Sequence, residues 1–247
     1  MSDAGAFFYD RPQVFETYLE RRQQATSAND TLELPIIRAL LPGLTGADIL
    51  DVGCGDAAIA SELLDAGAAH YTGFDSSERM IALAQKHLSD HLPMTLYQDF
   101  IESWPFETEA HDLVLSRLAF HYVETLSPIF ARIYQSLKPG GHFVFSVEHP
   151  VITSHQQSFK NKGSSAGWAV ERYFETGKRD IPWLGGEVVK YHRTVEDHFQ
   201  ALQETGFSIL SLRESRPDPQ RFTDRKLYEK RARYPLFLFF KAQKPDV

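Results

Sequence analysis

The sequence predicts an α/β fold with a mostly parallel β-sheet, and three observations support this prediction. An apolar run at residues 49–52 ends in a turn of small residues and is followed by helix-forming residues. Gly67 ends that helix, and a second apolar run follows at residues 69–74. Two strands joined by a helix at this spacing form a βαβ unit, whose strands are parallel. The 247 residues are also enough for one large α/β domain with its own core.

The turn after the first strand carries Gly53 and Gly55. Glycines let a ligand approach the main chain where a Cβ would intrude. We expect unpaired backbone N–H groups to face a crevice here, because the strand breaks and passes into a helix. Asp75 ends the second strand about twenty residues later, which suits a carboxylate that accepts hydrogen bonds from ribose hydroxyls. A ligand that contains a nucleoside is therefore expected.

Two segments carry a family resemblance. The residues Asp-Val-Gly-Cys-Gly at 51–55 resemble motif I of class I S-adenosylmethionine-dependent methyltransferases, and Gly-Phe-Asp-Ser-Ser at 73–77 resembles the acidic motif that follows it. Ala57 stands where the family commonly has a third glycine, and we expect tighter packing there. The resemblance rests on motifs over residues 46–150 and on pattern alone over 194–243. It implies a Rossmann-like, seven-stranded, mostly parallel sheet in the order 3-2-1-4-5-7-6, with the last strand antiparallel and helices flanking it.

Composition restricts the partners and the compartment that we expect. Apolar residues make up 43% and charged residues 24% of the chain, which is ordinary for a globular protein. A net charge of −7 disfavours a nucleic-acid partner, because such partners are bound by neutralising phosphates. No apolar run is long enough for a bilayer and no secretory pattern is present, so we expect no membrane association. The single cysteine excludes an intrachain disulfide and fits a reducing, cytoplasmic setting.

We expect a single methyltransferase domain made of four parts. A helical arm at residues 1–45 precedes a cofactor-binding core at 46–150. An aromatic-rich lid insertion at 151–193 follows the fifth strand, and a closing helix and hairpin occupy 194–247. The sequence leaves monomer and homodimer open, and without a Cys/His zinc pattern we expect no metal.

The N-terminal arm combines aromatic and charged residues. Apolar residues recur at helical spacing between positions 14 and 19, which predicts a helix whose apolar stripe packs on the domain. Related methyltransferases often cover their site with an N-terminal segment. The alternative is therefore a lid in which Tyr9, Tyr18 or Arg22 contacts the ligand. A second helix is expected at 33–41.

The core and the closing part continue the alternation of helices and strands. Ser76 or Ser77 is a suitable N-cap for a helix that runs to about Leu88. Thr194 and Gly206 have the residue types of an N-cap and a C′ position. The expected elements are strands at 93–98, 112–116 and 142–147, a helix at 126–137, a turn at 138–141, a helix at 195–205 and strands at 207–212 and 235–241.

The insertion at 151–193 does not belong to this alternation. A long aromatic-rich segment is uncommon unless it has a function. Aromatic side chains such as those of Trp168, Tyr173 and Trp183 offer apolar walls with a polar tip, which suits a small organic molecule. We predict a lid over the acceptor side; the alternative is a hydrophobic cluster that only covers the sheet edge.

The resemblance implies S-adenosyl-L-methionine as the cofactor. It places Asp51 near the methionine ammonium, Asp99 and Phe100 at the adenine, and Met80 either against the adenine or in the core. The acid at position 75 is assigned to the ribose. We therefore expect cofactor contacts from Asp51, Gly53, Cys54, Gly55, Asp75, Ser76, Met80, Asp99, Phe100 and Ser116.

The acceptor side depends on which atom is methylated. The cofactor supplies the electrophile, so the protein has to supply position, a dry crevice and charge complementarity. An oxygen nucleophile would gain from a base with a pKa near neutrality, such as histidine. A carboxylate acceptor would need no base, only a cation that holds it. A nitrogen acceptor could use a glutamate. The candidates are His121, His149 and His192 as base, Arg117 or Arg193 for a carboxylate, and Glu148 or Glu214 for nitrogen.

We expect a small-molecule acceptor, with O-methylation ahead of N-methylation. The alternatives are a catalytically silent module that binds the cofactor, and a methyltransferase that acts on a macromolecule through a basic rim. A nicotinamide-dependent dehydrogenase is disfavoured, because Asp51 precedes the glycines and the later glycine is missing. The expected acceptor contacts are Tyr18, Arg22, Tyr122, Trp168, Tyr173, Trp183 and Arg193.

Overall fold

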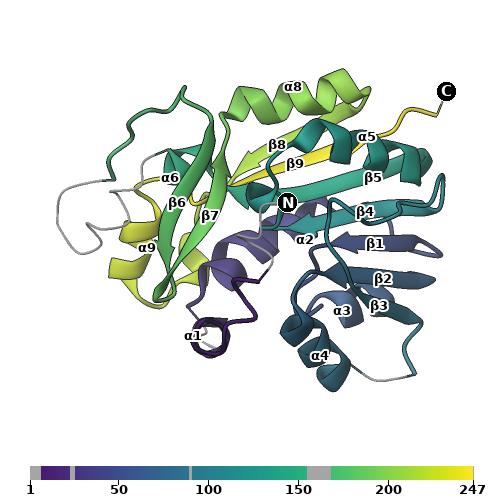
Figure 1. Ribbon diagram of the computed structural model, residues 1–247, viewed down its shortest axis with the longest axis horizontal. Helices are drawn as coiled ribbons and strands as arrows, with labels where there is room; N and C mark the ends of the chain where they lie inside the picture. The colour runs from purple at the N-terminus through teal and green to yellow at the C-terminus, as the bar shows by residue number, and fades with distance from the viewer. Residues whose placement is uncertain (1–6, 23–25, 89–90, 155–167, 247) are drawn as a thin grey trace.

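The computed structural model describes residues 7–22, 26–88, 91–154 and 168–246. Seven strands form one sheet in the order β3-β2-β1-β4-β5-β9-β8, and a separate two-stranded sheet pairs β6 with β7 (Figure 1). The strands are β1 (Asp48–Val52), β2 (His70–Asp75), β3 (Met94–Gln98), β4 (His111–Arg117), β5 (Leu137–Glu148), β6 (Gly177–Trp183), β7 (Gly186–His192), β8 (Ser208–Glu214) and β9 (Phe237–Gln243).

The predicted strand order is confirmed, with β9 and β8 as the closing strands. The strands β3, β2, β1, β4 and β5 are parallel to one another. Strand β9 is antiparallel to both of its neighbours, β5 and β8. The helices are α1 (Pro12–Arg22), η1 (Asn29–Glu33), α2 (Leu34–Leu40), α3 (Ala60–Asp65), α4 (Glu78–His87), η2 (Phe120–Tyr122), α5 (Leu126–Ser136), α6 (Pro150–Thr153), α8 (Val195–Thr205), η3 (Pro219–Arg221) and α9 (Arg225–Arg231). None of the described helices is long and apolar enough to cross a membrane.

Helix ends follow the local chemistry of the chain. Ser77 is the N-cap of α4, and its hydroxyl accepts a hydrogen bond from the backbone N–H of Met80. Thr194 and Asp197 form a capping box at the start of α8. Gly206 ends that helix in the left-handed conformation, with φ of 100°. The predicted caps are confirmed because each depends on residues only a few positions apart.

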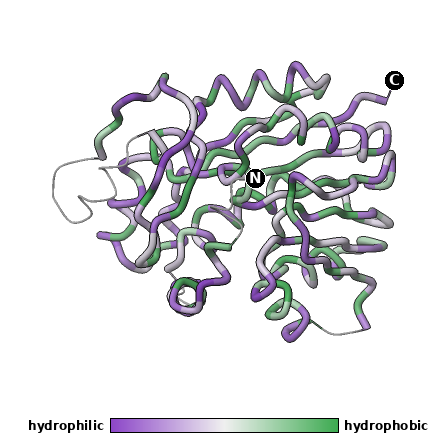
Figure 2. The backbone as a smooth tube through the Cα atoms, in the orientation of Figure 1, coloured by the Kyte–Doolittle hydropathy of each residue, from purple (hydrophilic) through white to green (hydrophobic). Residues whose placement is uncertain are grey.

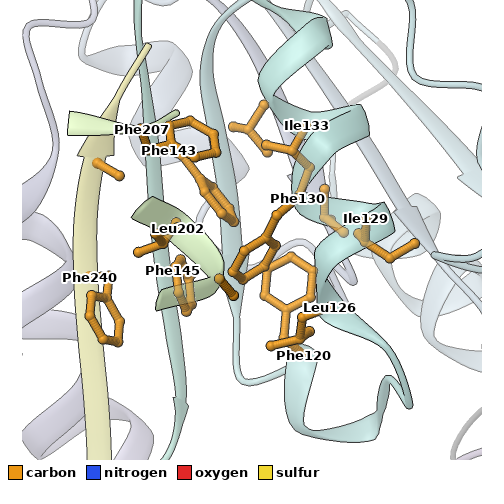
Figure 3. Packing of buried hydrophobic residues seen from close by; sticks show 14 of the residues in the cluster. Phe120, Leu126, Ile129, Phe130, Ile133, Phe143, Phe145, Leu202, Phe207 and Phe240 are labelled. Carbon is orange, nitrogen blue, oxygen red and sulfur yellow. The ribbon is translucent and has the colours of Figure 1, made fainter. Parts of the chain in front are cut away.

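Apolar side chains cover both faces of the central sheet. Alternate residues of β5 point in opposite directions, so Phe143 and Phe145 join the core under α5 and α8 (Figure 3), while Val144 joins the core under α2. Figure 2 shows the same pattern as hydrophobic colour along β1, β4 and β5. The two buried faces hold the carboxyl ends of β1, β2 and β4 at one edge.

The insertion contains a hairpin that the sequence did not predict. Leu184 and Gly185, at the turn between β6 and β7, both have positive φ values of 49° and 80°, which is the backbone of a type I′ turn. Leucine is an unusual residue there, so the usual turn signal is missing. Ile181 and Val188 of the hairpin pack with Phe8 of the arm in a third apolar cluster.

Two further boundaries differ from the prediction. Strand β5 begins at Leu137, so the expected turn at 138–141 is part of an extended segment. The link between β8 and β9, expected as a loop, contains the short helix α9. The only apolar residues of this helix are Leu227 and Tyr228, so its sequence lacks the apolar periodicity that marks a helix.

Removing the ring of Phe130 should destabilise the fold strongly. This ring is fully buried and lies 5.3–5.4 Å, between ring centroids, from Phe120, Phe143 and Phe145. Phe130→Ala should lower the free energy of unfolding by about 3–5 kcal/mol, because a cavity replaces the ring. Phe174 is 85% exposed, and Phe174→Ala should change it by no more than about 0.5 kcal/mol. Urea denaturation measures both, and equal effects would contradict this packing.

Candidate active site

A cavity of about 1670 Å³ opens where β1, β2 and β4 end. Residues after the carboxyl ends of these strands form one wall, and the N-terminal arm, the insertion and α9 form the others. Figure 1 shows the arm, the β6–β7 hairpin and α9 gathered beyond this edge of the sheet. In open parallel sheets, ligands bind at this edge.

The first glycine of the turn after β1 leaves no room for a side chain. Gly53 has φ of 71°, and a Cβ on it would lie 2.6 Å from the Cβ of Ala119. Its N–H and that of Cys54 donate to the carbonyl of Phe74 at 2.9 and 3.0 Å. The N–H of Gly55 donates to Oδ2 of Asp75 at 2.9 Å. The expectation of unpaired N–H groups is therefore corrected: β2 takes up these donors, since it lies alongside the turn.

Ala57 replaces the third glycine of the family pattern. It has φ of 49°, a conformation that glycine adopts most readily, and its side chain is fully buried in the core on the α2 face. The methyl group fills space that a glycine would leave empty.

Asp75 is held in place by two backbone donors. Its Oδ1 accepts from the N–H of Ser77 at 2.9 Å, and its Oδ2 accepts from the N–H of Gly55. Burial raises the pKa of the carboxyl group, and the two N–H groups act in the opposite direction. A carboxylate has about four lone-pair sites, so it can still accept from two hydroxyl groups at the cavity wall.

Asp51 lies beneath the glycine turn rather than in the cavity wall. It is 1% exposed, and its Oδ2 accepts from the hydroxyl of Tyr71 at 2.7 Å. Its Oδ1 has no hydrogen-bond partner among the described residues. Burial raises the pKa of Asp51 to about 7. A buried carboxylate oxygen without a donor fits a nearby cationic group, such as the ammonium of a methionine moiety.

Three of the predicted cofactor residues lie outside the cavity wall. Asp51 is one of them; Asp99 accepts from the hydroxyl of Ser103 at 2.6 Å, and the buried Ser116 donates to the carbonyl of Val52 at 2.8 Å. The predicted cofactor residues in the wall are Gly53, Cys54, Gly55, Asp75, Ser76, Met80 and Phe100.

Some of the residues predicted to contact the acceptor line the cavity, and others do not. Tyr173 and Arg193 lie outside the wall. Arg193 donates to the carbonyls of Val123 and Glu124 at 2.7 and 2.5 Å. The hydroxyl of Tyr173 accepts from the N–H of Val195 at 3.2 Å. The predicted acceptor residues in the wall are Tyr18, Arg22, Tyr122, Trp168 and Trp183.

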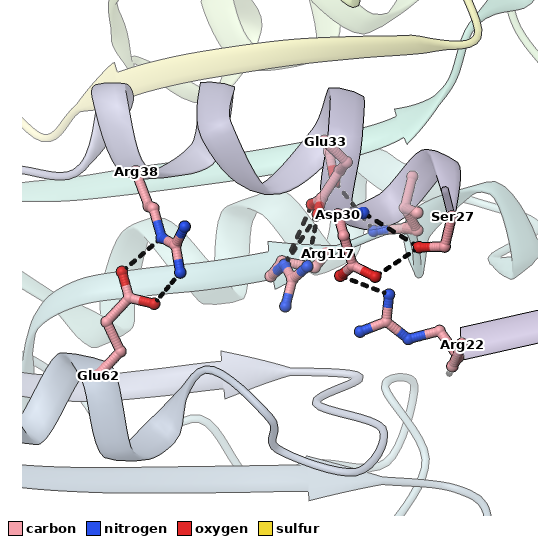
Figure 4. A network of polar contacts seen from close by, with 9 residues as sticks. Arg22, Ser27, Asp30, Glu33, Arg38, Glu62 and Arg117 are labelled. Carbon is pink, nitrogen blue, oxygen red and sulfur yellow. Dashed lines mark hydrogen bonds and ion pairs between the residues drawn. The ribbon is translucent and has the colours of Figure 1, made fainter. Parts of the chain in front are cut away.

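A buried ion pair supports the middle of the cavity wall (Figure 4). Arg117, at the end of β4, lines the cavity and donates to Glu33 of η1 at 2.5–3.2 Å. Glu33 is fully buried and also accepts from the hydroxyl of Ser146 at 2.9 Å. Burial lowers the pKa of Arg117, but Glu33 outweighs it and the net shift is upward. The Arg117 charge is thus compensated inside the protein.

Aromatic side chains from separate segments meet at the far end. The hydroxyls of Tyr9 and Tyr122 lie 2.8 Å apart, and the rings of Tyr9 and Tyr18 are 5.3 Å apart. Burial raises the pKa of Tyr18 to about 12, so its phenol is neutral. Lys190 is fully buried, 2.5 Å from Glu148 between Nζ and Oε1. Lys190 is the partner of the wall residue Glu148, and sequence reasoning missed it, since a lone lysine in a hairpin carries no signal.

Of the three candidate histidines, one lines the cavity. Burial lowers the pKa of His121 to about 3, so its imidazole is neutral. His149 has its ring nitrogens engaged with Glu214 Oε1 at 2.9 Å and the N–H of Val151 at 3.1 Å. His192 contacts the Thr153 hydroxyl and the Tyr173 carbonyl at 2.7 and 2.8 Å, so these two histidines serve packing and hydrogen bonding outside the wall.

The arm is fastened beside the cofactor edge by Asp10. Its Oδ1 accepts from the hydroxyl of Ser77 at 2.5 Å and from the N–H of Arg79 at 3.2 Å. Sequence reasoning missed these contacts, because Ser77 and Arg79 lie 67 and 69 positions after Asp10 in the chain. Among the described residues, no cluster of His, Cys, Asp and Glu could hold a metal ion.

Comparisons with known proteins agree with this geometry. The family model described as "Methyltransferase domain" matches residues 49–141. The S-adenosylmethionine-dependent methyltransferase of Mesorhizobium loti, a solved structure, is 34% identical with a TM-score of 0.80, and the match covers 90% of this chain and 99% of that chain. The chain belongs to the class I S-adenosylmethionine-dependent methyltransferases. S-adenosylmethionine is therefore the cofactor of this methyltransferase.

Two curated relatives extend the comparison. An uncharacterized protein of Haemophilus influenzae is 32% identical to the methyltransferase, over 96% of this chain and 97% of its own length. The ubiquinone biosynthesis O-methyltransferase of Proteus mirabilis is 32% identical over 47% of each chain. The methyltransferase thus spans about half the length of that relative.

Asp51 should make the stability of the methyltransferase depend on pH. Its folded pKa of about 7 lies above the value of about 3.9 in an unfolded chain. Between these values only the folded state holds the proton, so the free energy of unfolding falls as pH rises, by about 1.4 kcal/mol per pH unit. Asp51→Asn removes this titration and should flatten the slope by that amount between about pH 5 and 6.5.

Urea denaturation at a series of pH values measures both slopes. Asp65 is exposed at the end of α3, and Asp65→Asn should keep the wild-type slope. Identical slopes for wild type and Asp51→Asn would contradict the buried, donor-poor setting of this carboxyl group.

Proposed function

We propose that the methyltransferase transfers the methyl group of S-adenosylmethionine to a small-molecule acceptor, and to oxygen in preference to nitrogen. The observation that carries this proposal is the enclosure of the acceptor end by aromatic side chains. Tyr9 and Tyr18 come from the arm, Tyr122 from η2, and Trp168 and Trp183 from the insertion. Such walls suit a small organic molecule and leave little access for a folded macromolecule.

For the cofactor, we assign the ribose to Asp75 and place the ammonium near Asp51, whose carboxyl group lies beneath the turn and outside the cavity wall. Main chain at Gly53 would pass close to the methionine part, because a Cβ there has no space. Phe100 and Met80, both in the wall, would pack on the adenine. Asp99 and Ser116 would act through the segments that they hold, since both side chains are already bonded to neighbours.

For the reaction, bound cofactor supplies an electrophilic methyl group on a sulfonium. The protein side of the reaction is orientation and exclusion of water. His121 accepts from the Glu148 N–H through Nδ1 at 3.4 Å, which leaves its proton on Nε2 for donation to an acceptor oxygen. With a pKa of about 3 it is a weak base. An acceptor that reacts as an oxygen anion fits this site, because it needs no strong base.

The O-methyl preference agrees with the Proteus mirabilis relative, whose name is that of an O-methyltransferase. The match covers about half of either chain, so it supports the reaction class and does not extend to that relative's acceptor.

Incubation with methyl-labelled S-adenosylmethionine and a whole bacterial extract tests the proposal. Label should enter the fraction that passes a small-pore filter, on an oxygen that mass spectrometry locates. Label confined to protein or nucleic acid would overturn it in favour of a macromolecular acceptor. Cofactor binding with no transfer to any fraction would point to a silent binding module.

Substitution of Asp75 tests the cofactor assignment. Asp75→Ala removes a carboxylate that would accept from ribose hydroxyls, so affinity for S-adenosylhomocysteine should fall by about 1.5–3 kcal/mol. Asp65→Ala, on the exposed end of α3, should leave the affinity unchanged. Isothermal titration calorimetry measures both, and thermal denaturation shows whether each variant is folded. An unchanged affinity for folded Asp75→Ala would refute the ribose role.

A further inference from the structure

Neither of the two arginines that the sequence offers for an acidic acceptor suits the role. Arg117 is paired with the buried Glu33, and Arg193 lies outside the cavity wall, where it donates to the carbonyls of Val123 and Glu124. Another cation must serve if the acceptor is an anion.

Arg231 is such a cation. It is the last residue of α9, the helix between β8 and β9, and it lines the cavity. Its Nε is buried and has no hydrogen-bond partner among the described residues. None of the ion pairs in the described part of the chain involves Arg231. Burial lowers the pKa of its guanidinium. A partly desolvated guanidinium without an anion is costly, and an anionic ligand would compensate it.

Two of the acids in the cavity wall already have partners within the protein. Glu148 is bound to Lys190, and Asp75 accepts from two backbone N–H groups. Figure 1 shows α9, α6 and the β6–β7 hairpin on the left and α4 at the lower right. The anion site would therefore lie toward the acceptor end and away from the ribose site.

Apolar and aromatic groups line the cavity with Arg231. The rings of Trp168 and Tyr234 are 5.1 Å apart, and Ile152 and Leu236 belong to the same apolar cluster. The indole N–H of Trp168 donates to the carbonyl of Val151 at 2.8 Å, which fixes the ring. A cation next to fixed apolar walls is complementary to a molecule with an acidic group on an apolar body.

We propose that the methyl acceptor is a small anion whose carboxylate or phosphate group is bound by the guanidinium of Arg231, with Trp168 and Tyr234 against its apolar body. The inference rests on the proposed small-molecule function and names the substrate class for it. Planar guanidinium binds either oxyanion through paired N–H donors.

Binding of simple probes tests the inference without turnover. Benzoate, phenyl phosphate and the neutral benzamide are titrated at low salt into the whole protein saturated with S-adenosylhomocysteine, and calorimetry reads the affinities. At least one of the anions should bind about tenfold or more tightly than benzamide. Which anion binds distinguishes a carboxylate from a phosphate acceptor.

The variants Arg231→Gln and Arg233→Gln form a matched pair. Arg233 lies two positions further along, is exposed, and is absent from the cavity wall. Arg231→Gln should remove the preference for the anion, Arg231→Lys should retain part of it, and Arg233→Gln should keep it in full. The cofactor affinity should be unchanged in all of them, which shows that the fold and the ribose site are intact.

Three results would overturn the inference: benzamide binding as tightly as both anions, no binding of any probe to the wild-type protein, or an anion preference that survives Arg231→Gln. Failure of the proposed function has a different signature. It is seen in the labelling experiment as label in macromolecules or as no transfer.

Discussion

The site depends on the hydrogen bonds between the glycine turn and the end of β2. Gly53 and Cys54 both donate to the carbonyl of Phe74, and Gly55 donates to the carboxylate of Asp75. These contacts hold the main chain of the two glycines at the cavity wall and fix the acid that faces it. Because the donors and the acceptors belong to adjacent parallel strands, a shift of one strand against the other would displace both parts of the site.

Charge inside the cavity wall is largely compensated by the protein itself. Arg117 is paired with Glu33, and Lys190 with Glu148, and in each pair one partner is fully buried. A buried ion pair stabilises a fold weakly, but loss of one partner leaves an uncompensated buried charge that costs several kcal/mol. These pairs therefore support the wall, while Arg231 is a cation of the wall whose Nε has no hydrogen-bond partner among the described residues.

The arm and the insertion pack together around the aromatic end of the cavity. Phe8 and Val14 of the arm pack with Ile181 and Val188 of the hairpin. The arm precedes the cofactor-binding core in the sequence and the insertion follows it. Each segment has apolar side chains that are buried by this contact. Their packing places aromatic side chains of both segments in the cavity wall.

The sequence by itself determined the helix caps and the glycine turn, and its resemblance to a known family implied the order of the strands and the cofactor. The caps and the turn are carried by residues close together in the chain, such as the glycine turn at 53–55 and the capping box at Thr194. Only the tertiary structure decided which distant side chains meet. Tyr9 and Tyr122 are 113 positions apart and Glu33 and Arg117 are 84 apart, and no local pattern encodes such pairs. They meet because the strand order and the packing of the arm bring their elements to one edge of the sheet.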